Sequence, residues 1–274
     1  MHTLKRKFMM DFHTHCNYSP DSDTPMEDMI MAAIQIGITD LAFTDHVDID
    51  ADIDNYPQDW DFDRNAFEKD IFSMQEKYQE KINIYQGLEV GVQPHLIEKN
   101  AEIVKGNQYD FVIASLHSVE KRDLYHKKFF EHHNDIEAVQ IYYTELEKSL
   151  RKPMDFSVLG HLDLYLRYKP ELKNVAAKHY DDIVHVIFKK IIEDGKGIEL
   201  NAGGFRYGLN QNNPGMTLLK LYKEMKGEVI TLGSDAHSPK YLGSNYKENC
   251  ELLKSIGFKY VTTFKKMKPV FHKL

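Results

Sequence analysis

Imidazole and carboxylate side chains recur in this sequence at spacings that suit metal binding. His13 and His15 are separated by one residue, and Asp235 and His237 repeat that spacing near the other end of the chain. Because alternate residues at the end of a strand point to the same side, each pair can face one cavity. Zn²⁺, Mn²⁺ and Fe²⁺ all accept imidazole together with carboxylate, so the residue types predict a divalent metal without selecting one of the three.

More such side chains are present than one metal ion can hold. They come just past the C-terminal ends of predicted strands, and they are His13, His15, Asp45, His46, Glu89, His117, His161, Asp163, Asn201, Asp235 and His237. At about four to five ligands per ion, with one shared carboxylate, the set suits about two or three ions. Any single pair could instead be a helix cap or a surface ion pair, but such features have no reason to follow successive strands.

The remaining histidines lie at the termini, in polar stretches or in predicted helices. They are not assigned to the site: His2, His95, His126, His132, His133, His179, His185 and His272.

The segments that must position the candidate ligands alternate between short apolar runs and stretches with helical spacing. The apolar runs predict strands at Phe8–Phe12, Leu41–Thr44, Ile82–Leu88, Phe111–Leu116, Ser157–Leu159, Gly197–Leu200, Val229–Gly233 and Tyr260–Thr263. Helices are predicted at Pro25–Ile36, Phe62–Glu80, Leu96–Lys105, Ile136–Lys152, Tyr180–Asp194, Thr217–Lys226 and Tyr246–Ser255. This alternation is typical of parallel βαβ units, which close most simply into an α/β barrel whose catalytic groups gather at the C-terminal rim of the strands.

Composition and charge indicate an ordinary soluble protein. The chain has 274 residues with 42% hydrophobic and 28% charged side chains, and no linker or repeat divides it, so we expect a single domain over residues 1–274. No apolar run approaches the about 18 residues of a membrane span, and Cys16 and Cys250 make no disulfide framework, which predicts a cytoplasmic protein with free thiols. The net charge of −7 argues against a surface that grips nucleic acid.

Six short motifs, in this order, resemble the metal-binding motifs of the PHP superfamily, named for polymerases and histidinol phosphatases. They are HTH, TDH, GLE, SLH, GHLD and SDAH, and the resemblance covers the chain from Phe8 to about His237. It implies a distorted (β/α)7 barrel, similar to a TIM barrel, with a trinuclear metal centre at the C-terminal rim. In such a barrel, Tyr260–Thr263 would be a peripheral extension rather than a closing strand.

The same resemblance implies which side chains hold each ion. The first would be held by His13, His15, Glu89 and Asp235, the second by Glu89, His117 and His161, and the third by His46, His237 and Asp21. Asp23 lies close enough in sequence to replace Asp21. Asp45 and Asp163 adjoin proposed ligands and would orient their imidazoles.

The segments GHLDLYLRY and ELNAGGFR are most similar to the stand-alone histidinol-phosphate phosphatases of histidine biosynthesis. This likeness implies a metal-dependent phosphomonoesterase that hydrolyses L-histidinol phosphate to L-histidinol and phosphate, by attack of a hydroxide held between ions. Arg167 and Arg206 would bind the phosphate, because a dianion needs cationic donors opposite the metals. Asn201 and His117 are further substrate-binding candidates, and Asp235 and His237 are catalytic candidates, with His237 or a metal-bound water protonating the leaving alkoxide.

Three alternatives share the ligands. A PHP-type nuclease or nucleotide phosphoesterase would need a basic channel with aromatic residues, a less specific phosphatase would accept other small monoesters, and a non-catalytic metal protein would not need the two arginines. The aspartate-rich loop Val47–Asp61 is a speculative specificity element, because carboxylates with Tyr56 or Trp60 could attract a cationic substrate or could simply be solvated. The sequence leaves the oligomeric state open.

Overall fold

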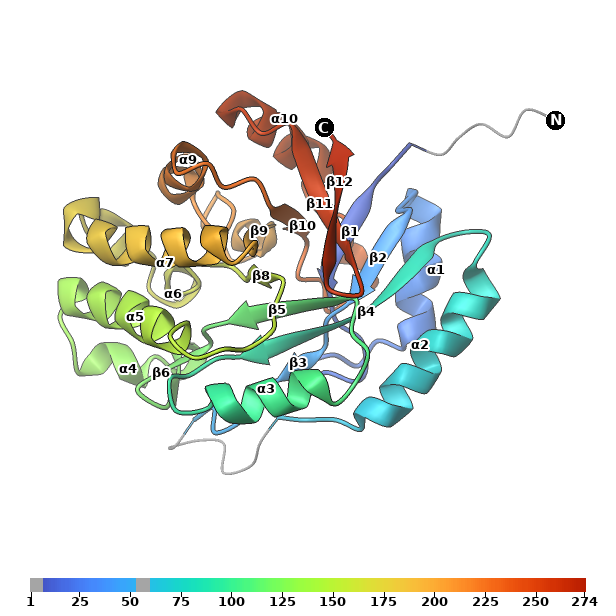
Figure 1. Cartoon of the computed structure of the whole chain (residues 1–274), viewed down its shortest axis with the longest axis horizontal. Coiled ribbons are helices and arrows are strands. Elements are labelled where there is room, and N and C mark those ends of the chain that lie inside the picture. The colour runs from blue at the N-terminus through green and yellow to red at the C-terminus, as the bar shows by residue number, and fades with distance from the viewer. Residues whose placement is uncertain (1–6, 53–59) are drawn as a thin grey trace.

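A computed structural model describes residues 7–52 and 60–274. Seven parallel strands pair in the order β1 (Met10–Thr14), β2 (Asp40–Phe43), β4 (Asn83–Gly91), β5 (Phe111–Ser115), β8 (Val158–Leu159), β9 (Gly197–Asn201) and β10 (Ile230–Gly233). The short strand β3 (His46–Val47) also pairs with β4. The fold is therefore mixed α/β, with a nearly closed parallel barrel of the TIM-like kind, as the alternation of strands and helices predicts (Figure 1).

The barrel closes between its first and last strands just at their C-terminal ends. The Asp235 amide donates to the His13 carbonyl at 2.8 Å, and Thr14 pairs with Ala236 through an isolated parallel bridge. The His15 amide then donates to the Ala236 carbonyl at 2.9 Å. Two predicted ligand pairs, from opposite ends of the chain, are thus brought side by side by backbone bonds.

Helices between the strands cover the outside of the barrel (Figure 1). The longer ones are α1 (Met26–Ile36), α2 (Arg64–Tyr78), α3 (Ile97–Lys105), α5 (Asp135–Ser149), α7 (Asp181–Glu193), α9 (Met216–Glu224) and α10 (Tyr246–Ile256). Several have sequence-encoded ends: Asn134 and Glu137 form a capping box at the start of α5, and Gly37 ends α1 at φ 90°. Within the described ranges, no helix is both long enough and apolar enough to cross a lipid bilayer.

Short elements lie in the loops and at the C-terminus. The one-turn helices are α4 (Lys128–Glu131), α6 (Tyr165–Tyr168) and α8 (Gly203–Arg206), with 3₁₀ turns η1 (Leu124–His126), η2 (Pro170–Asn174), η3 (Ala177–His179) and η4 (Pro239–Tyr241). The strands β6 (Ser118–Val119) and β7 (Arg122–Asp123) form one antiparallel hairpin, and β11 (Tyr260–Lys265) and β12 (Lys268–Lys273) form another. The predicted strand at Tyr260–Thr263 therefore exists, and it lies outside the barrel.

Two expectations about local structure are wrong. The first strand reaches Thr14 and the third predicted strand reaches Gly91, so His13 and Glu89 lie within strands rather than after them. Arg167 and Arg206 fall outside all the helices predicted from the sequence, but they lie in α6 and α8. A helix of four residues is too short to show a periodic pattern, which is why the sequence gives no sign of it.

Candidate metal centre

The first group of predicted ligands converges around the end of β1. His13, His15 and Asp235 each place one ligand atom within 4.8 Å of the others. His15 Nε2 lies 3.5 Å from both Asp235 Oδ1 and Glu89 Oε2, and His13 Nε2 lies 3.0 Å from Glu89 Oε2. All four side chains are buried, so two imidazoles and two carboxylates meet away from bulk water.

Glu89 stands between this group and a second one. Its Oε2 faces His13 and His15, whereas its Oε1 lies 2.9 Å from His161 Nε2 and 3.2 Å from His117 Nε2. The hydroxyl of Ser115 donates to Oε1 at 2.6 Å and fixes the carboxylate plane. One carboxylate with a different imidazole set on each oxygen is the arrangement that a bridging ligand requires.

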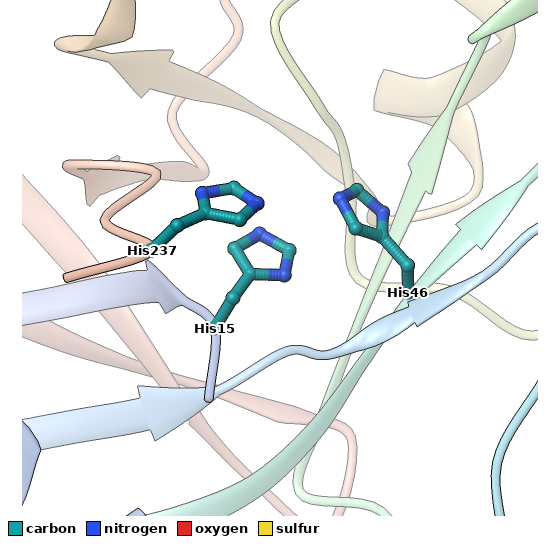
Figure 2. A group of neighbouring side chains, drawn as sticks. All are labelled: His15, His46 and His237. Atoms are coloured by element: carbon teal, nitrogen blue, oxygen red, sulfur yellow. The ribbon is translucent and has the colours of Figure 1, made fainter. Parts of the chain in front are cut away.

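A third group lies on the other side of His15. Figure 2 shows the rings of His15, His46 and His237 directed toward one another from separate segments, and their ligand atoms lie within 4.8 Å. Asp21 Oδ2 is 3.0 Å from His237 Nε2 and 3.8 Å from His46 Nε2. Among the described residues, therefore, Asp21 and not Asp23 lies within ion-pair distance of these imidazoles. His15 belongs to both the first and the third group.

The described residues give one further group, which the sequence reasoning did not assign to the metal centre. Asp48 joins His46 and His117, and its Oδ1 accepts a hydrogen bond from His117 Nδ1 at 2.8 Å. That bond orients the ring so that His117 Nε2 is directed at Glu89. Asp48 belongs to the loop that the sequence suggested as a substrate-binding element, but the structure turns it toward the candidate metal ligands.

Two other side chains that orient imidazoles were missed. Glu199 Oε1 accepts from His13 Nδ1 at 2.7 Å, and the Ser19 hydroxyl bonds His15 Nδ1 at 2.9 Å. Ser19 is held in turn by Asp45 at 2.9 Å, so the expected orienting effect of Asp45 acts through a hydroxyl. Glu199 alternates with Asn201 at the end of a strand, the same spacing that singled out the HTH and DAH motifs, and this signal could have identified it.

The prediction that Asp163 orients an imidazole is wrong. Its carboxylate accepts from Asn213 Nδ2 at 2.6 Å and from the Gly215 amide at 2.8 Å. Asn213 in turn accepts from Arg167 Nε at 3.1 Å. Asp163 therefore positions the guanidinium of Arg167 through Asn213.

Unsatisfied nitrogen atoms test whether this pocket fits metal ions. His15 Nε2 and His237 Nε2 are inaccessible to solvent and have no hydrogen-bond partner among the described residues. Buried polar atoms normally have hydrogen-bond partners, because a buried donor or acceptor without one costs about 1–3 kcal/mol. Here the lone nitrogens are directed at carboxylate oxygens that also have lone pairs, and a divalent cation among them would satisfy both. The donor set fits Zn²⁺ or a similar ion.

The carboxylates of the centre are negatively charged at neutral pH. Burial opposes ionisation of Glu89, but His13, His46 and His117 hold its pKa well below the ordinary value. Burial likewise opposes ionisation of Asp235, and Arg167 is the main group that holds its pKa well below the ordinary value. The pocket therefore keeps fixed negative charge for a cation.

The imidazoles respond in opposite ways to the same environment. Burial and the neighbouring His237 and His46 hold the pKa of His15 well below its ordinary value, so His15 is neutral. At His46, burial is outweighed by Glu89 and other carboxylates, which raise its pKa to about 9. In the metal-free protein, His46 thus carries a proton that a cation would displace.

Arg167 is the predicted phosphate-binding residue that reaches the pocket. Its Nη1 donates to Asp235 Oδ2 at 2.7 Å, and Nη2 donates to Asn201 Oδ1 at 2.8 Å. Asn201 is buried behind the guanidinium and does not line the cavity, so the expectation that Asn201 contacts substrate is replaced by a positioning function. Arg206 donates to the carbonyls of Ser234 and Asp235 at 3.2 and 2.7 Å and supports the turn that carries Asp235.

A cavity of about 400 Å³ opens onto the three groups. Candidate ligands on its wall are Asp21, His46, His117, His161, Asp235 and His237, together with Arg167. The rest of the wall is mainly aromatic and acidic, with Trp60, Asp123, Tyr125, Tyr168 and Tyr207. The cavity is large enough for a small metabolite beside a metal cluster.

Residues 11–203 match the family model of the PHP domain, and the chain belongs to that family. It is similar to the histidinol-phosphatase of Lactococcus lactis, with 27% identity over 263 residues that cover 94% of this chain and 95% of the relative. A probable histidinol-phosphatase of Clostridium acetobutylicum is 28% identical over 255 residues, which cover 89% of this chain and 94% of the relative.

Solved structures show the same likeness. The crystal structure of histidinol phosphate phosphatase from Lactococcus lactis, complexed with zinc, L-histidinol and phosphate, superposes with a TM-score of 0.84 at 25% identity and covers 96% of this chain and 100% of that one. A putative histidinol phosphatase from Listeria monocytogenes has the same fold, with a TM-score of 0.77 at 17% identity over 88% of this chain and 100% of that one.

Proposed function

We propose that this protein is a metal-dependent phosphomonoesterase that hydrolyses L-histidinol phosphate to L-histidinol and inorganic phosphate. The carrying observation is that Glu89 presents each carboxylate oxygen to a separate imidazole set, and that His117 and His161 of one set line a cavity together with Arg167. Relatives of nearly equal length, named histidinol-phosphatases, support the choice of substrate. The structure from Lactococcus lactis that contains L-histidinol and phosphate supports it further.

The proposed ligands are the three groups described above: His13, His15, Glu89 and Asp235; Glu89, His117 and His161; and His46, His237 and Asp21. We propose zinc as the first ion to test, since the similar structure from Lactococcus lactis contains it, with two or three ions per chain. Bound divalent ions would supply a hydroxide nucleophile at neutral pH and neutralise phosphoryl charge.

The protein's own side chains would then position the ester. A guanidinium has five N–H groups, and the bonds of Arg167 to Asp235, Asn201 and Asn213 use one from each nitrogen. One N–H remains on Nη1 and one on Nη2, which suits two oxygens of a phosphate dianion. Arg206 would hold the Asp235 turn and add positive charge behind it.

The decisive experiment compares three substrates with metal-loaded protein: L-histidinol phosphate, p-nitrophenyl phosphate and single-stranded DNA. We expect phosphate release from L-histidinol phosphate at the highest kcat/KM, and loss of that activity in His13→Ala and Asp235→Asn. The exposed variant Glu193→Gln, on α7, is the control and should keep wild-type activity. Cleavage of DNA with no release from L-histidinol phosphate would identify a nuclease instead.

A further inference from the structure

The cavity wall includes one carboxylate that the metal centre does not use. Asp123 ends strand β7, and its Oδ1 accepts the Tyr125 amide at 2.7 Å, which starts the 3₁₀ turn η1. It is part of none of the metal-competent groups found among the described residues. Its position on the wall therefore calls for a different explanation.

The other carboxylates of the cavity already face cationic or ligating groups. Asp21 lies 3.0 Å from His237 Nε2, Asp48 lies 2.8 Å from His117 Nδ1, and Asp235 lies 2.7 Å from Arg167 Nη1. Asp123, which is half-buried, has no ion-pair partner of this kind among the residues that the structure describes. Burial raises its pKa above the ordinary value, although His117 and His126 partly offset that effect. A half-buried carboxylate with no cation in direct contact is available to pair with one that a ligand supplies.

The acidic loop does not meet this need with its described carboxylates. Asp48 is turned to His117, and Asp50 lies 2.7 Å from His95 and 3.1 Å from Lys121. Asp52 and Asp61 are not part of the cavity wall, and Asp61 pairs with Arg64. The residues from 53 to 59, including Tyr56, lie outside the described part of the chain. Among the described residues, Asp123 is a better candidate than the aspartates of the loop to bind a cationic group of a substrate.

Aromatic rings line the same cavity as this carboxylate. Tyr125 and Tyr168 both line the cavity, and their rings meet edge to face with centroids 6.1 Å apart. Aromatic faces attract ammonium and imidazolium groups, with a strength that increases when the pair is shielded from water. Carboxylate and rings together form a cavity wall that suits a planar or compact cation.

We propose that Asp123, with Tyr125 and Tyr168, binds a protonated nitrogen of the alcohol part of the substrate and makes the enzyme select cationic phosphomonoesters over neutral ones of similar size. This inference rests on the proposed function, since the metal side of the cavity and Arg167 would hold the phosphate. The rest of the cavity wall must then contact the alcohol part of the substrate. Asp123 makes that contact favour a positively charged alcohol part over a neutral one.

The test measures charge preference in Asp123→Asn with metal-loaded protein. The substrates are L-histidinol phosphate and phosphoethanolamine, which are cationic at the alcohol part, and phenyl phosphate, which is neutral there. We expect kcat/KM for the two cationic esters to fall about 10- to 100-fold, mainly through KM, the change that loss of one charge-assisted hydrogen bond produces. Activity with phenyl phosphate should stay within about twofold of wild type.

Controls separate recognition from folding and from long-range charge. Asp155→Asn removes an exposed carboxylate at the opposite end of the barrel, beside Lys196, and should leave the preference unchanged. Asp123→Glu keeps the charge and should restore part of the preference that Asp123→Asn loses. Metal content and Tm of each variant show whether the fold is intact.

Binding of L-histidinol alone, measured by calorimetry, gives a readout that does not need turnover. Weaker binding to Asp123→Asn than to wild type supports the proposal, even if L-histidinol phosphate turns out not to be the substrate. Equal binding, or an equal loss of kcat/KM on all three esters, overturns it. If wild type hydrolyses phenyl phosphate but neither cationic ester, both the proposed function and this inference are wrong. If it hydrolyses phosphoethanolamine but not L-histidinol phosphate, only the former is wrong.

Discussion

His13 donates its Nδ1 proton to Glu199 at 2.7 Å, and neither side chain is exposed to solvent. The bond fixes the ring and directs Nε2 at Glu89 3.0 Å away, so that Nε2 is the nitrogen that would face a metal ion once it loses its proton. The other Glu199 oxygen accepts the His161 amide at 3.0 Å, so one carboxylate positions ligands of two metal groups.

Replacing Glu199 with glutamine should weaken metal binding. The amide has no full negative charge for the imidazole, so we expect affinity to fall about 10- to 100-fold, as for other groups that orient a ligand. Competition with a chromophoric chelator measures this. Glu193→Gln, on the exposed face of α7, is the matched control, and equal affinities for wild type and Glu199→Gln would contradict the assignment.

The two arginines should differ in their contribution to catalysis. Arg167→Lys keeps a charge but loses the planar fork that bonds Asp235, Asn201 and Asn213, so we expect kcat/KM to fall about 10²- to 10³-fold. Arg206→Lys should lose less, because its bonds go to backbone carbonyls. Steady-state kinetics with L-histidinol phosphate decide the order, and a larger loss in Arg206→Lys would reverse the assignment.

Removal of metal should lower the stability of the protein. The proposed ligands come from distant segments and meet only in the folded barrel, so metal ions should bind the native state and not the unfolded chain. Such binding adds about 2.7 kcal/mol of stability at one hundred times Kd. We expect a chelator to lower Tm and added Zn²⁺ to restore it, as followed by calorimetry. The same chelator should leave Tm of His15→Ala nearly unchanged if His15 is a ligand.

Metal loading should release protons at pH 7. The pKa of His46 is raised to about 9, and carboxylates outweigh burial to raise those of His13 and His117 well above the ordinary value. These imidazoles are protonated below their pKa, and a metal ion needs their lone pairs, so binding should release on the order of one proton or more and tighten as pH rises. Calorimetry in HEPES and Tris, which differ in ionisation enthalpy, counts the protons. A release of zero would contradict the pKa directions.

A methyl group at Gly233 should disturb the candidate metal centre through Glu199 and His13. A Cβ built there lies 2.1 Å from Glu199 Oε1 and 2.5 Å from the Cβ of His13, closer than atoms can approach. We expect Gly233→Ala to cost about 1–3 kcal/mol in unfolding free energy and to weaken metal binding. Gly106→Ala is the control, since Gly106 ends α3 at φ −68° and its nearest neighbour would be 3.3 Å away.

Much of the barrel was predictable because its signals are local. Alternating apolar runs and helical spacing located its strands, and short polar motifs at their ends marked the candidate ligands. The strand-end spacing could also have marked Glu199, but the partners of Glu199 and Asn213 were not predictable in this way. Their functions depend on contacts with His13 and Arg167, which lie far away in sequence and come together only when the barrel closes.

Predictions also failed where charge alone was the guide. The role of the aspartate-rich loop is only partly visible: Trp60 lines the cavity, but Asp48 supports His117. A further carboxylate on the cavity wall, Asp123, comes instead from the hairpin of β6 and β7. Asn201 and Asp163 were expected at the substrate and at an imidazole, but both hold Arg167 in place directly or through Asn213. Distinguishing a contacting residue from a supporting one requires coordinates.

The junction where the first and last barrel strands meet passes directly through the candidate ligands. The Asp235 amide donates a hydrogen bond to the His13 carbonyl, and Asp235 adopts a left-handed backbone at φ 57°. Its main chain therefore joins the two strands, while its side chain is a candidate metal ligand. Ions bound there would link the first and last strands of the barrel. Hydrogen exchange at the backbone amides of Asp235 and Ala236 should therefore slow as ions bind. The order in which ions bind could then be followed by exchange, without an activity assay.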